Sequence, residues 1–183
     1  MAVMRGSIMT HDAERRACLM EFLCERGSEL SIAFDLQAFL SNMKQATPHV
    51  LVLDLYAADP NEAEILRAAR AEGYRGKVVV LARPSTSATL SECWKIGIDQ
   101  VVGGIQVTDG AFDPGRVEIA IRASFEQEIA QRAYQLWVQL GRPKAQDPQT
   151  RAQAEEEVIS RFGHTAQSAT IAAKHEEQRR KEP

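Results

Sequence analysis

The sequence lacks several features that would assign a protein to a class at once. No apolar run approaches the roughly 20 residues that a membrane-spanning helix needs, and the first residues lack the apolar segment of a secretory signal. We therefore expect neither a membrane partner nor export. Cysteine is scarce: three residues, odd in number and without metal-ligand spacing, exclude a disulfide scaffold. They predict reduced, buried thiols in a cytoplasmic protein.

An excess of charge of one sign is also lacking. The net charge is −3, from 22 Lys and Arg against 25 Asp and Glu. Residues 1–113 carry 11 basic and 15 acidic residues, and residues 114–183 carry 11 and 10. Neither part has the basic character of a nucleic-acid-binding protein, so nucleic acid is not an expected partner.

Strand and helix patterns alternate through the first 125 residues. The segment from Pro48 to Leu55 contains a continuous apolar run that predicts a strand buried on both faces. The predicted strands are 3–9, 29–34, 48–55, 77–82 and 100–102, and the predicted helices are 13–26, 36–44, 62–72 and 85–95. Strands that alternate with helices indicate an α/β fold, a doubly wound five-stranded parallel sheet.

Asp54 ends the central strand. In open parallel sheets, ligands bind at the carboxyl ends of the strands. This edge should bring together residues 10–12, 54–56, 82–83 and 103–104. Asp54 is then either a polar residue that ends a strand or a reactive, metal-binding carboxylate.

Four segments carry a resemblance to a known family. They are Val50 to Leu55, Glu64 to Arg67, Lys77 to Ala82 and Gly97 to Asp99. In order and spacing they resemble the receiver domains of bacterial two-component response regulators, over about residues 5–126. The resemblance implies a flavodoxin-like fold in which Asp54 accepts a phosphoryl group from a histidine kinase. It also implies a Mg²⁺ ion, for which the candidate ligands are Asp12, Asp54 and the carbonyl group of Tyr56.

The receiver pattern is incomplete here. The family's acid pair, switch hydroxyl and switch lysine fall on Thr10 and His11, Ala82, and Gly104. Asp12 lies one position late, and Arg83 is the nearest cation that could replace the lysine. Mg²⁺ affinity should therefore be weak. We predict a pseudo-receiver, not an enzyme, that acts through protein–protein interaction with a histidine kinase or another signalling protein. The alternatives are an atypical receiver phosphorylated on Asp54 and a DNA-binding transcriptional regulator.

The C-terminal part predicts a helical extension. A long helix over 114–140, a turn at 141–143 and a second helix from 147 to 162 follow the sheet. The order Ile129 to Trp137, Gly141-Arg142-Pro143, Asp147 and Ala154-Glu155 resembles a short bacterial helical domain of unknown function, over about 126–160. The predicted domains are 1–126, 127–163 and a charged tail, 164–183. Tyr134 and Trp137 either pack inside this hairpin or bind a partner. A homodimer through the long helix is one candidate assembly.

Overall fold

A computed structural model gives the fold of residues 3–55, 62–83, 86–103, 112–141 and 148–161. The five strands are β1 (Arg5–Met9), β2 (Glu29–Ala33), β3 (Val50–Asp54), β4 (Lys77–Ala82) and β5 (Gln100–Gly103). The labelled helices are α1 (Ala13–Glu25), α2 (Leu36–Gln45), α3 (Glu62–Ala71), α4 (Ser87–Ile96) and α5 (Pro114–Gln139). A further helix covers residues 148–161.

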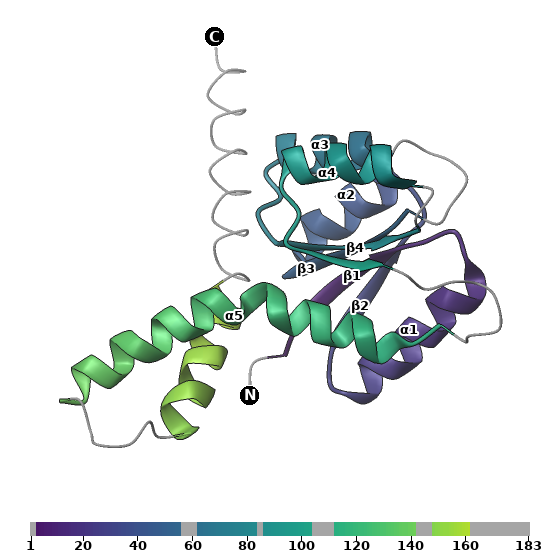
Figure 1. Cartoon of the computed structure of the whole chain (residues 1–183). Coiled ribbons are helices and arrows are strands. Elements are labelled where there is room, and N and C mark those ends of the chain that lie inside the picture. Colours follow the sequence, from purple (N-terminus) through teal and green to yellow (C-terminus); the bar gives the residue numbers. More distant parts are fainter. Residues whose placement is uncertain (1–2, 56–61, 84–85, 104–111, 142–147, 162–183) are drawn as a thin grey trace, which may run out of the picture.

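The strands form one parallel sheet in the order β2-β1-β3-β4-β5. Helices α2, α3 and α4 cover one face, and α1 and α5 cover the other (Figure 1). The predicted doubly wound sheet and its helical C-terminal extension are therefore confirmed. The central strand, β3, is buried along its whole length, because both faces of the sheet carry helices.

Aspartate side chains fix where three of the helices begin. Asp12, Asp35 and Asp113 are the N-cap residues of α1, α2 and α5, and each side chain accepts a hydrogen bond from a backbone N–H of the first turn. Pro114 follows Asp113 at the first helical position, where its missing N–H has no cost. The helix starts predicted at residues 13, 36 and 114 are confirmed.

The hydrophobic core has two parts, one on each side of the sheet. Under α1 and α5, Leu19, Leu23 and Phe125 pack against the strands. Under α2, α3 and α4, the largest buried side chains include Phe39 and Tyr74, whose rings meet edge to face with centroids 5.4 Å apart. Together the two parts hold the strand ends, and thus the edge that carries Asp54, in a fixed arrangement.

Helix α5 extends beyond the sheet. It runs without a break through the predicted boundary between residues 126 and 127, and its distal half projects away from the sheet (Figure 1). The helix over 148–161 packs against this half: Ala154 and Val158 are buried in the same cluster as Ile129 and Leu136. The helical hairpin therefore docks on the α/β domain through a shared core. The predicted domain boundaries themselves stay a prediction, and the tail from 164 onward lies outside the described residues.

Leu140, the C-cap residue of α5, is exposed. The predicted burial of the three thiols is confirmed only in part. Of the three free thiols, Cys93 is buried, Cys18 is half-buried and Cys24 is exposed. Within the described ranges, no helix is long and apolar enough to cross a bilayer.

Candidate functional site

The carboxyl ends of β1 and β3 lie side by side at the point where the strand order reverses. Thr10 follows β1, and Asp54 is the last residue of β3. Both are buried. The expected edge of the sheet thus places a buried carboxylate at the position where doubly wound proteins bind ligands.

The carboxylate of Asp54 is bound by two side chains of its own chain. Arg15 Nη1 lies 2.5 Å from Asp54 Oδ2, and Thr10 Oγ1 donates a hydrogen bond to the same oxygen at 2.6 Å. The Asp54 side chain is 1% exposed and that of Arg15 is 10% exposed. A buried charge pair of this kind must be hydrogen-bonded to be tolerated, and these contacts meet that need.

Arg15 is itself held in place from two sides. Its Nη2 lies 3.0 Å from Asp12 Oδ2, and its guanidinium carbon lies 5.7 Å from the centre of the Phe112 ring. The Asp12 carboxylate also accepts the backbone N–H of Arg15 at 2.9 Å, which is the N-cap bond of α1. A helix start and an ion pair therefore aim the arginine at Asp54.

The described residues at this edge do not fit a Mg²⁺ ion. Magnesium needs several oxygen ligands in octahedral geometry. Here Asp54 Oδ2 accepts an arginine and a threonine, and Asp12 pairs with the same arginine. Within the described part of the chain, no cluster of three or more Asp, Glu, His or Cys residues could hold a metal. Arg15 therefore engages both of the described carboxylates that were candidate metal ligands.

The other predicted site residues have mixed positions. Ala82 is buried at the end of β4, and Arg83 follows it, half-buried, with its backbone bonded to Thr86. Tyr56 and Gly104 lie outside the described residues. Roles for these four residues in a switch or a metal site stay predictions.

Sequence reasoning missed Arg15. A signal was present, because Arg15, Leu19 and Leu23 follow one another at a spacing of four and are the buried residues of α1. A charged residue on the buried stripe of a helix needs a buried partner of opposite charge. The carboxylate at the end of the neighbouring strand is that partner.

Solved structures share this fold. A crystal structure of NtrX from Brucella abortus with ADP has a TM-score of 0.58 and 16% identity, and the match covers 76% of this chain and 30% of that one. The response regulator receiver domain protein from Methanospirillum hungatei JF-1 has a TM-score of 0.59 and 15% identity, and the match covers 69% of this chain and 96% of that one. FixJ-N has a TM-score of 0.58 and 21% identity, and the match covers 69% of this chain and 96% of that one. The α/β domain has the receiver fold.

This chain spans about 30% of the length of the NtrX chain. At identities of 16%, 15% and 21%, the three matches show the receiver fold. No curated protein matches the sequence. A family model described as a protein of unknown function (DUF2934) matches residues 124–159, nearly the span of the predicted hairpin domain.

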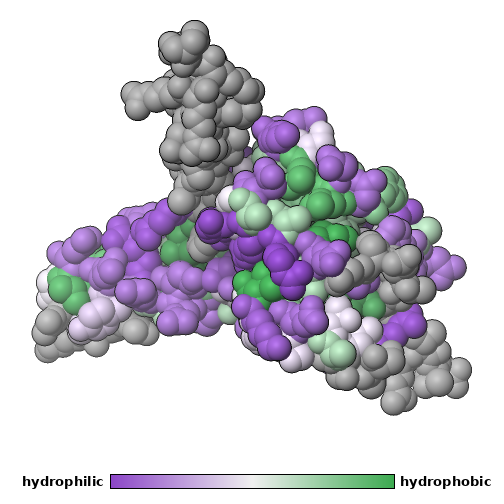
Figure 2. All heavy atoms as spheres, turned by 90° about the horizontal axis from the view of Figure 1, so that it is seen from above, coloured by the Kyte–Doolittle hydropathy of each residue, from purple (hydrophilic) through white to green (hydrophobic). Residues whose placement is uncertain are grey.

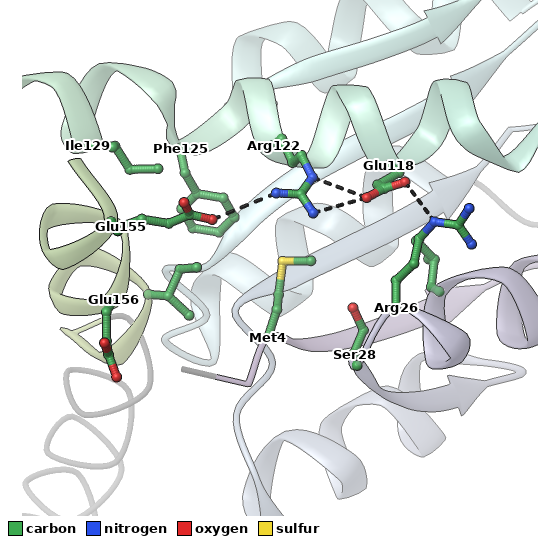
Figure 3. Close-up of a pocket in the computed structure, with 13 residues that line it drawn as sticks. Met4, Arg26, Ser28, Glu118, Arg122, Phe125, Ile129, Glu155 and Glu156 are labelled. Carbon is green, nitrogen blue, oxygen red and sulfur yellow. Dashed lines mark hydrogen bonds and ion pairs between the residues drawn. The ribbon is translucent and has the colours of Figure 1, made fainter. Parts of the chain in front are cut away.

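A cavity of about 380 Å³ lies where the receiver fold meets the hairpin, near Met4 and Ser28 and thus at the strand edge opposite Asp54. Glu118 of α5 pairs with Arg26 at 3.2 Å and with Arg122 at 3.0 Å, and Arg122 lies 3.7 Å from Glu155 of the last helix (Figure 3). This row of charges joins α1, α5 and the helix over 148–161 across the cavity. It supports docking of the hairpin, and we assign no chemistry to it.

The two predicted partner-binding residues lie on the projecting half of α5. Tyr134 is 58% exposed, and its ring centroid lies 5.8 Å from that of the half-buried Trp137. The interpretation of Tyr134 as a packing residue inside the hairpin is therefore wrong. A role for either residue in binding stays a proposal.

Proposed function

We propose that this protein is a pseudo-receiver: a signalling protein with a receiver fold in which Asp54 is held in a permanent ion pair and does not accept phosphate. The observation that carries the proposal is the 2.5 Å contact between Arg15 Nη1 and Asp54 Oδ2. Its output is protein–protein interaction, with a histidine kinase or another signalling protein among the partners.

The chemistry of phosphoryl transfer supports this reading. A carboxylate that attacks a phosphoryl group must offer a free oxygen in line with the leaving group, and a divalent cation must neutralise the developing charge. The contacts of Arg15 and Thr10 engage one oxygen of Asp54, and Arg15 neutralises its charge in the resting protein. A phosphodonor would have to displace a buried ion pair before it reacts.

The test is intact-mass detection of phosphate after incubation with Mg²⁺ and acetyl phosphate. We expect no adduct on the wild-type protein under conditions that label an ordinary receiver domain. Arg15→Ala removes the guanidinium, and Arg16→Ala is the matched control, because Arg16 contacts the backbone carbonyl of Thr10 and the ring of Phe34 instead of Asp54. An adduct on the wild type that disappears in Asp54→Ala would refute the proposal and establish the atypical phosphoacceptor.

The helices that follow the receiver fold also support a binding role. The family model of unknown function (DUF2934) matches residues 124–159, and the helix over 148–161 in that span shares a core with α5; both support a binding role. The chain as a whole has a net charge of −3, which disfavours the DNA-binding alternative. A salt-dependent gel-shift measurement tests that alternative directly: protein-dependent retardation of DNA that weakens steeply with salt would restore it.

A further inference from the structure

We infer that the projecting half of α5 binds a second copy of this chain, in an antiparallel arrangement centred on Tyr134. This inference rests on the proposed binding role and names its partner, and it does not depend on whether Asp54 accepts phosphate. It concerns one stripe of α5, the Tyr134 face, which consists of Gln127, Gln131, Tyr134 and Val138.

The Tyr134 face is defined by helix geometry. Its members follow one another at spacings of four, three and four residues, so they lie on one side of the helix. All four are exposed. The opposite side carries Ile129 and Leu136, which are buried against the helix over 148–161. The hairpin therefore fills one side of α5 and leaves the Tyr134 face uncovered by the described residues.

The distribution of charge along α5 indicates what covers this face. Residues 114–128 carry five charged side chains, whereas residues 129–141 carry one, Arg132. Arg132 pairs with Glu157 of the neighbouring helix, on the hairpin side. Exposed helix surfaces normally carry charges, and interface centres are depleted of charge and enriched in aromatic residues. The end of α5 that projects farthest from the sheet thus has the composition of an interface.

Uncharged surface favours a second copy over a charged partner. A charged partner would have to bury its charge against a face without a counter-charge, which is costly. Two Tyr134 faces related by a two-fold axis form an isologous contact, in which neutral surface meets neutral surface. An antiparallel pair centred on Tyr134 places Gln131 of each copy beside Val138 of the other. Figure 2 also shows hydrophobic atoms at the end of the projecting part of the molecule.

The contact is short. Residues 127–140 span about 21 Å of helix at 1.5 Å per residue. Such an interface lies at the small end of specific contacts, so we expect dimers that form with a dissociation constant in the micromolar range.

Sedimentation equilibrium of the full chain between 5 and about 200 µM tests the inference. The wild type should shift from monomer toward dimer over this range. Val138→Arg places a charge in the Tyr134 face and should leave the protein monomeric throughout. Gln139→Arg is the matched control: it adds the same charge at the neighbouring exposed position, off the face, and should dimerise as the wild type does.

A second variant tests the direction of pairing. Gln131→Glu combined with Val138→Arg places opposite charges beside each other only in an antiparallel pair, so this double variant should regain dimerisation. In a parallel pair the two arginines would face each other, and dimerisation would stay lost.

A wild type that is monomeric at 200 µM would overturn the inference, as would a Val138→Arg protein that still dimerises or a Gln139→Arg protein that does not. Phosphorylation of Asp54 is measured by mass and dimerisation by sedimentation. A failure of the pseudo-receiver assignment is therefore distinguished from a failure of the dimer inference.

Discussion

Removal of the arginine at the buried ion pair should have a large and specific cost. Arg15→Met keeps the apolar stem of the side chain but leaves the Asp54 carboxylate, 1% exposed, without its charged partner. Deleting one partner of a buried ion pair typically costs about 3–5 kcal/mol, because the remaining charge has lost its solvation and its counter-charge. Thr10 still donates to the carboxylate, so we expect a loss of about 3 kcal/mol in the free energy of unfolding.

The opposite deletion should cost less. Asp54→Asn removes the carboxylate, but Arg15 keeps Asp12, whose side chain is 41% exposed, as a partner. We expect a loss of about 1–2 kcal/mol. The double variant Arg15→Met with Asp54→Leu removes both charges and replaces them with apolar groups. It should recover most of the loss, because buried ion pairs replaced as a whole by apolar residues are often neutral.

Urea denaturation at pH 7 compares the free energies of unfolding of the wild type and these three variants. Arg16→Met is the control, and it should lose about 1 kcal/mol or less, because its contacts with Phe34 and a backbone carbonyl are partly exposed. An Arg15→Met protein that is destabilised no more than Arg16→Met would refute the reading of this ion pair.

Three further predictions concern other parts of the molecule. Burial, with a smaller effect of a nearby arginine, lowers the pKa of His49 from 6.5 to about 4. The contribution of the neutral His49 to the free energy of unfolding should therefore be complete above pH 6.5 and fall by about 1–3 kcal/mol as the pH drops toward 4. In urea titrations, His49→Asn should flatten this pH dependence. Ala154→Leu should lose about 1–3 kcal/mol by overpacking the fully buried position between α5 and the last helix, whereas Ala152→Leu, beside the cavity, should stay close to wild type in the same assay. A thiol reagent at pH 8 should label the exposed Cys24 quickly and Cys93 only on unfolding, because burial raises the pKa of Cys93 to about 11; equal rates would contradict its burial.

Local sequence signals were sufficient for the fold. The strand predicted over 77–82 is β4 to the residue, because a β-branched run bounded by turns has one stable place in a buried parallel sheet. The helix starts at residues 13, 36 and 114 could be predicted as well, since their caps, Asp12, Asp35 and Asp113, bind residues three positions away or fewer. The position of Asp54 at the functional edge followed from strand order alone.

Only part of the candidate site could be predicted from the sequence. The Arg15–Asp54 contact joins residues 39 apart in sequence, and no local pattern states that a helix residue reaches a strand end. The choice between packing and binding at Tyr134 stayed open for a related reason. Helical spacing groups residues into faces, but which face a second helix covers is decided by tertiary packing.

The continuous helix α5 changes what the boundary near residue 126 means. That boundary separates two sequence resemblances, yet Phe125 on one side and Ile129 on the other belong to a single hydrophobic cluster with Val79 and Val158. A chain cut there would lose half of a helix and part of its core. The two segments should therefore melt in one cooperative transition, as one folding unit built from two units of sequence.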